Sequence, residues 1–333
     1  MKKIIFALCV SLMASQLMAI ESVNADLKEF KREVTKEYSV GTNPKLNIDN
    51  RYGNIRIIEG ADNRISFKIE IIGKANTEAL AKEYAETVSI DFSQSGDNVA
   101  ATTNLRSINC NNCGRETHYT VVAPKSVTMA LTNKYGNIVL DNSVKPLTID
   151  LKYGGLEANN LANVTIDLKY GHANINACAE LNLNCAYSKI KIGTADRITT
   201  ESKYDDFQIG TVSTVLMDTK YTQVKIDRLN NSFVCDDFKY CGLNIAEVST
   251  QFSQIKVNAG YSQIRLGLDN RHSFKASLKV RYGSIKTNNL TFNNVSFGDK
   301  QRNAESINGT AGSASNPSAT VEISNEYGEI VFN

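Results

Sequence analysis

Residues 134–140 have the sequence KYGNIVL, and variants of this segment recur five more times at an almost fixed interval. The later copies are KYGGLEA (152–158), KYGHANI (169–175), AYSKIKI (186–192), KYDDFQI (203–209) and KYTQVKI (220–226). Their tyrosines are separated by 18 residues once and then by 17 residues four times. A period this short is typical of one supersecondary unit that stacks on copies of itself. The six tyrosines are Tyr135, Tyr153, Tyr170, Tyr187, Tyr204 and Tyr221.

The segment also recurs less regularly, so that eleven of the fourteen tyrosines belong to a copy. One early copy is RYGNIRI around Tyr52, and later copies contain Tyr240, Tyr261, Tyr282 and Tyr327. In QFSQIKV, residues 251–257, Phe252 is interpreted as an aromatic substitute for the tyrosine. The step from Phe252 to Tyr261 is only nine residues, which predicts a shortened coil or a tight hairpin at this point.

Small or apolar residues lie at fixed distances from the tyrosines, six and four residues before them and three, five and eight residues after them. Around Tyr170 these residues are Val164, Ile166, Ala173, Ile175 and Cys178. Alternation with a period of two predicts β-strands with one buried face. A strand, a corner, a second strand and a turn in about 17 residues predict an all-β fold, a parallel β-solenoid (β-helix). We expect the corner just after the tyrosine, where a glycine often permits the bend.

The recurring tyrosines themselves have two interpretations. They could form a platform on which sugar rings stack, or a structural ladder inside the fold. Each tyrosine has the same parity as the inward positions that precede it. We therefore predict a structural ladder at an inward corner, where the rings serve the core and the hydroxyl groups reach the edge. The predicted ladder consists of Tyr135, Tyr153, Tyr170, Tyr187, Tyr204 and Tyr221.

The segments on either side of the repeats predict a cap at each end. Residues 20–128 are expected to form an N-terminal capping region that includes the first YGNI coil. Within it we expect antiparallel strands at 64–72, 88–92, 98–103 and 118–122, and one short helix at 76–87 with Asn76 as its cap. Regular coils are predicted for residues 129–290. A flexible polar loop and a closing pair of strands are predicted for residues 291–333.

The first 19 residues predict a secretory signal peptide. Lys2 and Lys3 precede an apolar segment, and Ala19 is a suitable residue for cleavage. No later segment has the roughly 18 apolar residues of a membrane-spanning helix. Without the two lysines the chain has 35 basic and 35 acidic residues. This balance argues against a general nucleic-acid or anionic-membrane binder, and the predicted location is the periplasm or the cell surface.

These features resemble the bacterial putative-adhesin domain, a family of exported β-solenoid proteins common in Bacteroidetes. The resemblance rests on an early YGNI segment, a long strand, a short helix, serial Y-G-x-I coils and a final G-E-I-V strand. It covers the chain from about Pro44 to Asn333. The resemblance implies a β-solenoid with a role in adhesion, and it provides no set of functional residues.

Two columns of basic residues are expected on the outward faces. The first column directly precedes the tyrosines and consists of Lys134, Lys152, Lys169, Lys203, Lys220 and Lys239, with Arg51 and Arg281. Acidic residues stand two positions earlier, at Asp150, Asp167, Glu201, Asp218 and Asp237. We interpret these two columns as a structural lattice of paired charges. A second column has no regular acidic partner and is the candidate contact face: Lys191, Lys225, Lys256, Arg265 and Lys286.

The cysteines are interpreted through the oxidising compartment in which an exported protein folds. Cys110 and Cys113 form a C-x-x-C motif near His118. A local disulfide is favoured over a zinc or redox site, because no second pair of ligands accompanies them. Cys178 and Cys185 fall in inward columns and are expected to be small core residues. Cys235 and Cys241 are expected to be free thiols.

Residues that would perform catalysis are not recognisable in the sequence. The three histidines share no register, and we find no nucleophile motif, metalloprotease motif or phosphate loop. We therefore predict an exported, non-catalytic protein without cofactor or metal that presents a repetitive face to a glycan or protein partner. One alternative is a periplasmic envelope scaffold or stress-linked sensor component. Another is a polysaccharide-processing β-helix enzyme with paired carboxylates.

Overall fold

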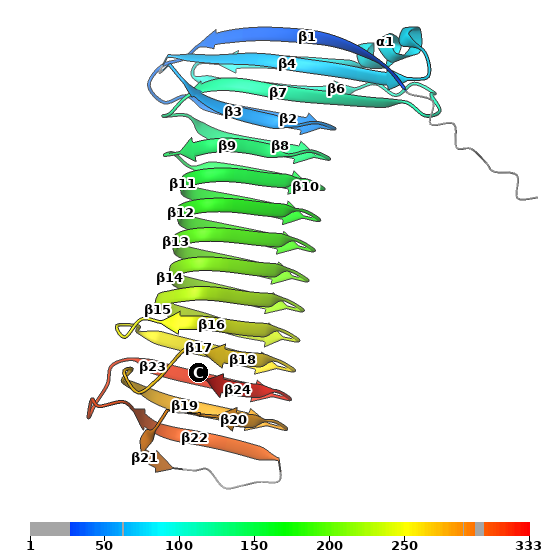
Figure 1. Ribbon diagram of the computed structural model, residues 1–333. Coiled ribbons are helices and arrows are strands. Elements are labelled where there is room, and N and C mark those ends of the chain that lie inside the picture. Colours follow the sequence, from blue (N-terminus) through cyan, green and yellow to red (C-terminus); the bar gives the residue numbers. More distant parts are fainter. Residues whose placement is uncertain (1–26, 62, 289, 297–302) are drawn as a thin grey trace, which may run out of the picture.

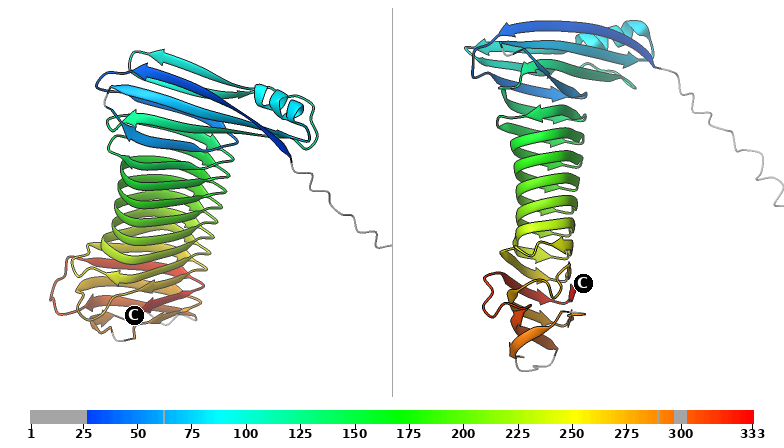
Figure 2. Two further views of the ribbon diagram at one scale, coloured as in Figure 1. Left: turned by 45° about the horizontal axis from the view of Figure 1, so that its top comes forward. Right: turned by 60° about the vertical axis from the view of Figure 1, so that its left-hand side comes forward.

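The computed structural model describes residues 27–61, 63–288, 290–296 and 303–333, and the predicted signal peptide lies outside these residues. The prediction of an all-β fold is confirmed. One mostly parallel sheet of 24 strands and a single helix account for the regular structure of the described residues. The strands lie one above another in a long stack (Figure 1). Two further views show the N-terminal strands across one end of this stack and the C-terminal strands at the other (Figure 2).

The body of the stack consists of coils, each made of the strand before a tyrosine and the strand after it. Parallel pairing joins each coil to the next at the interval of the repeat: Ile149 pairs with Ile166, which pairs with Leu183. The strands are β8 (Thr128–Lys134), β9 (Ile138–Ser143), β10 (Leu147–Lys152), β11 (Gly155–Lys169), β12 (His172–Ala186), β13 (Lys189–Lys203), β14 (Asp206–Lys220), β15 (Gln223–Lys239), β16 (Gly242–Val248), β17 (Gln254–Gly260) and β18 (Gln263–Leu266). Each of β11 to β15 runs from one corner to the next.

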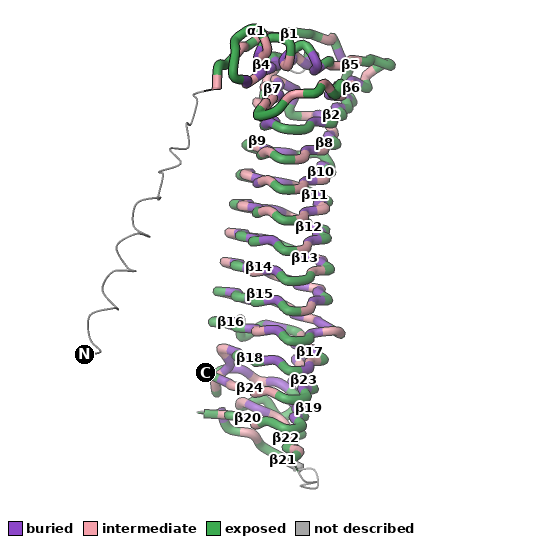
Figure 3. Tube along the Cα trace, turned by 90° about the vertical axis from the view of Figure 1, so that its right-hand side faces the viewer, coloured by how far each residue is buried: buried purple, intermediate pink, exposed green. Residues whose placement is uncertain are grey.

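The core of the stack is made by the apolar columns. Met129, Leu131, Ile138 and Leu140 are almost completely buried, and the corresponding residues of the following coils are buried with them. Burial alternates along each strand, so that purple and green segments follow one another in Figure 3. The predicted inward positions are therefore confirmed.

The corner differs from the expectation, because the tyrosine makes the bend and the glycine does not. All eleven repeat tyrosines have a positive φ, between 54° and 62°, whereas Gly136 and Gly154 do not. A left-handed conformation is unfavourable for a residue with a Cβ atom. It also reverses the alternation at this point, so that the tyrosine side chain leaves the core. The repeat tyrosines are accordingly exposed, by 40–52%.

The residue after the tyrosine points inward, and its backbone N–H needs a partner. In the middle of the stack this N–H donates to the side chain of the same position one coil further on. Ser188 donates to Asp205 Oδ1 (2.7 Å), Asp205 donates to Thr222 Oγ1 (3.3 Å), and Cys241 donates to Ser262 Oγ (3.1 Å). We call this buried series, which runs from Ser188 to Ser262, the corner column.

Corners near the two ends of the stack combine an asparagine with a glycine. Asn133 Nδ2 donates to the carbonyl oxygen of Gly53 (2.9 Å), and Asn325 Nδ2 donates to the carbonyl oxygen of Ser262 (2.8 Å). The chains approach so closely that a Cβ atom at Gly136 would lie 1.9 Å from the carbonyl oxygen of Gly53. Glycine is needed at these corners for space and not for its backbone freedom.

The N-terminal cap surrounds the first coil. Its elements are β1 (Lys28–Ser39), β2 (Lys45–Arg51), β3 (Ile55–Gly60), β4 (Arg64–Ala75), α1 (Glu78–Glu86), β5 (Val88–Ser95), β6 (Asn98–Leu105) and β7 (Gly114–Pro124). Strands β2 and β3 form the coil of Tyr52, and β6 and β7 cover its outer edge. Strands β4 and β1 extend the sheet in the antiparallel sense. The helix was predicted one residue off at its start, because its N-cap is Thr77, and β1 was not predicted.

The C-terminal part does not follow the chain order. Its strands are β19 (Phe274–Arg281), β20 (Ser284–Lys286), β21 (Phe292–Ser296), β22 (Ala304–Ala311), β23 (Thr320–Glu326) and β24 (Glu329–Phe332). Strands β23 and β24 lie between the coil of β17–β18 and the coil of β19–β20. The predicted closing pair is thus an inner coil. Part of the predicted polar loop is the strand β22, which pairs with β19.

The interpretation of Phe252 was also wrong. Phe252 is buried, has no positive φ and lies in the connection between β16 and β17, away from the tyrosine corners. Its ring packs edge-on against Phe274. The coil between Tyr240 and Tyr261 is therefore longer than its neighbours, with 21 residues.

Candidate functional site

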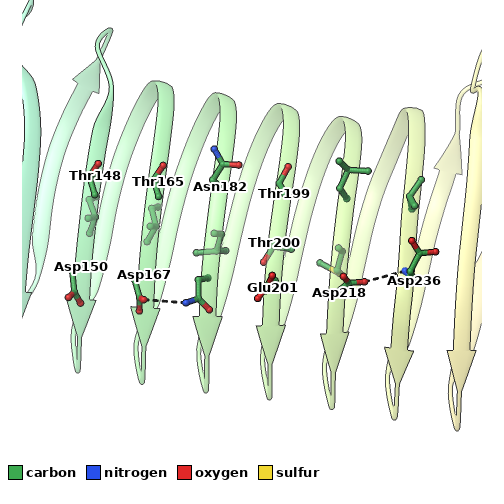
Figure 4. Close-up of a pocket in the computed structure, with 17 residues that line it drawn as sticks. Thr148, Asp150, Thr165, Asp167, Asn182, Thr199, Thr200, Glu201, Asp218 and Asp236 are labelled. Carbon is green, nitrogen blue, oxygen red and sulfur yellow. Dashed lines mark hydrogen bonds between the residues drawn. The ribbon is translucent and has the colours of Figure 1, made fainter.

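The largest hollow found in the described residues is a groove of about 610 Å³ on the face formed by the strands before the tyrosines. We call this surface the pre-corner face. Two outward columns line the groove across successive coils from β10 to β15 (Figure 4). The first column consists of Thr148, Thr165, Asn182 and Thr199, followed by Leu216 and Val234. The second consists of Asp150, Asp167, Asn184, Glu201 and Asp218, with Asp236 beside it.

The groove repeats its hydrogen-bonding groups once per coil, at the strand spacing of about 4.8 Å. Asn184 Nδ2 donates to Asp167 Oδ2 (3.2 Å), which links two coils within the second column. Thr165, Asn182 and Glu201 make no hydrogen bond or ion pair within the described part of the chain. Their polar groups therefore remain available to a ligand.

Charge in and beside the groove is predominantly negative. Lys152 pairs with Asp150 (3.3 Å) and Lys169 with Asp167 (3.4 Å) at one border. Lys256 pairs with Asp236 (2.8 Å) at the far end, and this hydrogen bond raises the pKa of Lys256. These pairs neutralise part of the carboxylates and leave Glu201 without a cation. Such a surface disfavours polyanions and suits neutral or cationic ligands.

The predicted lattice of paired charges is confirmed where lysines and acids meet. Asp237 contacts Lys239 of its own coil (2.9 Å) and Lys220 of the preceding coil (2.8 Å). The hydrogen bond from Lys220 lowers the pKa of Asp237 and raises that of Lys220. The first basic column is consequently not a free positive surface.

The second basic column does not form one continuous face. Lys191, Lys225 and Arg265 share one register on the strands after the tyrosines, the post-corner face, with Gln208 and Asn244 between them. Lys286 reaches the same register but pairs with Glu329 (2.9 Å). Lys256 was placed wrongly, because the Phe252 segment is not a corner and Lys256 therefore lies on the pre-corner face. Whether this column contacts a partner stays a prediction.

A smaller hollow of about 500 Å³ lies on the post-corner face. It is lined by amide and carboxylate side chains that bond to one another. Asn174 Nδ2 donates to Glu157 Oε1 (2.7 Å), and Asn159 Nδ2 donates to Asp141 Oδ1 (3.4 Å). Because these groups satisfy one another, this hollow offers fewer open hydrogen-bonding groups than the groove.

The tyrosine rings stack on one another in a continuous series, but outside the core. Adjacent ring centroids lie 4.6–5.1 Å apart and the ring planes differ by 3–12°. The inward corner predicted for them is therefore wrong. Each inner ring has its two faces covered by its neighbours, so a sugar ring could stack only at the two ends of the series.

The cysteines fall into two groups. Cys110 and Cys113 are joined as a disulfide in the loop between β6 and β7, with Cα atoms 5.8 Å apart. Cys178, Cys185, Cys235 and Cys241 are buried free thiols. Burial raises the pKa of Cys178 and Cys241 to about 11, so both stay protonated at neutral pH. Cys241 belongs to the corner column and donates to the carbonyl oxygen of Lys239 (3.0 Å).

The histidines lie in three separate places. His118 contacts Glu116 (2.9 Å) in the cap, and His172 lies near Glu157 (3.3 Å) on the post-corner face. His272 is buried and contacts the carbonyl oxygen of Val248 (2.9 Å). Within the described residues no group of three or more His, Cys, Asp or Glu side chains is arranged to hold a metal ion. None of their helices is long and apolar enough to span a membrane.

Sequence reasoning missed the threonine and asparagine column of the groove. Its signal is present, because Thr148, Thr165, Asn182 and Thr199 all stand five residues before a tyrosine. Outward polar residues on a strand usually indicate only a solvated face, and the hollow that they line depends on how neighbouring coils are arranged.

Comparison with solved structures found similar chains of adhesion proteins. A putative adhesin from Bacteroides fragilis NCTC 9343 shares 13% identity over 91% of this chain and 97% of its own, with a TM-score of 0.34. A putative cell adhesion protein from Clostridium sporogenes ATCC 15579 shares 11% identity over 91% of this chain and 99% of its own, with a TM-score of 0.23. A putative lipid binding protein from Parabacteroides distasonis ATCC 8503 shares 11% identity over 68% and 96%, with a TM-score of 0.37. No family model and no curated protein matches the sequence. The descriptions of these structures are consistent with the resemblance to the putative-adhesin family.

Proposed function

We propose that this protein is an exported, non-catalytic β-solenoid that binds an extended glycan along the groove of the pre-corner face. The observation that carries the proposal is the pair of polar columns that line the groove across successive coils. A linear polymer presents the same groups at regular intervals and can contact several coils at once. Many weak contacts then add through multivalency.

The chemistry of the lining favours a neutral or amino-bearing glycan over an acidic one. Threonine hydroxyls, asparagine amides and carboxylates are suitable partners for sugar hydroxyl groups. Unpaired Glu201 and the acidic border would repel carboxylate or sulfate groups on a ligand. The lysine column of the post-corner face would instead favour an acidic ligand, so the two faces make opposite predictions.

A glycan array with two matched variants tests this assignment. The groove variant combines Thr165→Ala, Asn182→Ala and Glu201→Ala, and the control variant combines Lys191→Ala, Lys225→Ala and Arg265→Ala. We expect the wild-type chain to bind neutral or amino-bearing linear glycans. The groove variant should bind about tenfold more weakly or worse, and the control variant should bind normally. Loss of binding only in the control variant would assign the function to the post-corner face and refute the groove.

Two further measurements address catalysis and location. Incubation with the bound glycan should release no new reducing ends, because we propose that the groove only binds. Protease treatment of intact cells should remove the protein if it acts as an adhesin. A protein that survives this treatment while a known surface protein is digested would favour the periplasmic scaffold.

A further inference from the structure

The eleven repeat tyrosines form one stack that does not follow the order of the sequence throughout. From the cap to the opposite end the order is Tyr52, Tyr135, Tyr153, Tyr170, Tyr187, Tyr204, Tyr221, Tyr240, Tyr261, Tyr327 and Tyr282. Tyr327 lies between Tyr261 and Tyr282, because its coil lies between theirs. We call this series the tyrosine stack.

The tyrosine stack is both ordered and accessible. The left-handed backbone holds each ring outside the core, where about half of its surface is exposed. Parallel pairing of the coils fixes the neighbouring ring at 4.6–5.1 Å. The other three tyrosines lie outside the stack: Tyr38 contacts Phe67 and Phe92, Tyr84 lies on α1, and Tyr119 is buried in the cap.

Phenol side chains in this arrangement have a specific reaction open to them. A one-electron oxidant removes one electron and one proton from each of two tyrosines, which gives two phenoxyl radicals. The radicals join through a carbon–carbon bond between ring positions next to the hydroxyl groups. The two ring hydrogens at those positions then move to the oxygens, and the product is dityrosine. Coupling normally requires two radicals to meet, and a fixed neighbour replaces that encounter with a local event.

We propose that the tyrosine stack is a site of oxidative cross-linking, at which a peroxidase with hydrogen peroxide joins neighbouring coils through dityrosine. One hydrogen peroxide accepts the two electrons and two protons lost per link and leaves as two water molecules. The coils that carry the stack contain four cysteines, and all four are buried free thiols. Dityrosine would therefore give the stack covalent links between coils that its cysteines do not provide. This proposal is independent of the glycan groove.

The test oxidises the purified wild-type chain at low concentration with a haem peroxidase and hydrogen peroxide. The chain has no tryptophan, so dityrosine fluorescence can be measured without interference. We expect fluorescence in the monomer, with the mass of two hydrogen atoms lost per link. Proteolysis and mass spectrometry should find Tyr261 linked to Tyr327, 66 residues away in the sequence. Tyr261 should not be linked to Tyr282, because Tyr327 lies between them.

A variant with alternate tyrosines replaced separates the stack from tyrosines in general. The substitutions Tyr135→Phe, Tyr170→Phe, Tyr204→Phe, Tyr240→Phe and Tyr327→Phe keep an aromatic ring at each position but leave no two neighbouring phenols. Dityrosine in the monomer should fall about tenfold. The control variant Tyr38→Phe with Tyr84→Phe should match wild type.

Three outcomes would overturn the proposal. Dityrosine confined to covalent dimers, links between Tyr261 and Tyr282, or an undiminished yield in the alternate variant would each show that the stack does not direct coupling. Circular dichroism checks that the variant folds. If it does not fold, the map of linked peptides from the wild-type chain decides the question alone.

Discussion

Corners in the middle of the stack and corners near its ends satisfy the same buried backbone in different ways. In the middle, side chains such as Asp205 and Thr222 accept the N–H groups of the preceding coil. Near the ends, glycine lets the chains approach, and Asn133 or Asn325 donates to a carbonyl oxygen. Both solutions surround a left-handed tyrosine. The difference teaches that the tyrosine defines the corner, while the residue after it depends on how closely neighbouring coils approach.

The largest effect is expected from filling the space at a glycine corner. In Gly154→Ala the new Cβ atom would lie 2.0 Å from the carbonyl oxygen of Gly136, which is backbone and cannot move aside cheaply. We expect a loss of about 3 kcal/mol in the free energy of unfolding, measured by urea denaturation.

The adjacent glycine provides the control for this substitution. In Gly155→Ala the nearest atoms belong to the imidazole of His172, a half-exposed side chain that can rotate away. Its effect should stay below about 1 kcal/mol. Equal losses in the two variants would show that backbone contact at the corner is not the reason for glycine.

A smaller loss is expected when the asparagine of an end corner is removed. Asn133 is fully buried, and its amide donates to Gly53 and accepts from Asn50 Nδ2 (3.3 Å). Leucine has a similar size and occupies the same column one coil further on, at Leu151. Asn133→Leu should therefore cost about 2 kcal/mol through unpaired polar groups, with little cavity. Wild-type stability in thermal unfolding would show that the asparagine is dispensable.

The corner column should respond more weakly to a single change. Thr222 Oγ1 accepts from the N–H of Asp205 and donates to the carbonyl oxygen of Lys220 (3.0 Å). Thr222→Val keeps the shape and removes both bonds, with an expected cost of about 1 kcal/mol. A loss larger than that of Asn133→Leu, measured in the same urea series, would reverse the ranking of the two corner types.

The smallest effect concerns pH and the buried carboxylate of the corner column. Burial raises the pKa of Asp205 above its ordinary value of 3.8, and hydrogen bonds from the N–H groups of Ser188 and Lys203 offset this only partly. Cys185 also donates to this carboxylate. The folded chain therefore takes up the proton at a higher pH than the unfolded chain, so this group favours folding more as the pH falls.

Urea titrations of wild type and Asp205→Asn at several pH values measure this contribution. The stability of wild type relative to the variant should rise from neutral pH down to the ordinary pKa of aspartate. A relative stability that falls over this range would mean that the hydrogen bonds outweigh burial.

The sequence predicts the core better than the surface. Columns such as Leu147, Val164 and Leu181 were placed correctly because alternation within a strand depends only on local backbone geometry. The tyrosines were misplaced because their positive φ reverses this alternation, and a tyrosine is an unusual residue for that conformation. The same error placed Phe252 at a corner and Lys256 on the wrong face. The groove was missed because its threonines and carboxylates resemble an ordinary solvated face.

Strands β23 and β24 impose an order on assembly. Residues 320–332 follow residues 274–311 in the chain but lie beneath them in the stack, against β17 and β18. The coil of β19–β20 therefore cannot reach its final seat until residues 320–332 have been synthesised. Coils up to β17–β18 are free to stack one by one as the chain emerges, whereas the C-terminal group must be set in place in a single late step. The rate of that step, and not the rate of stacking, would then limit how fast the chain matures.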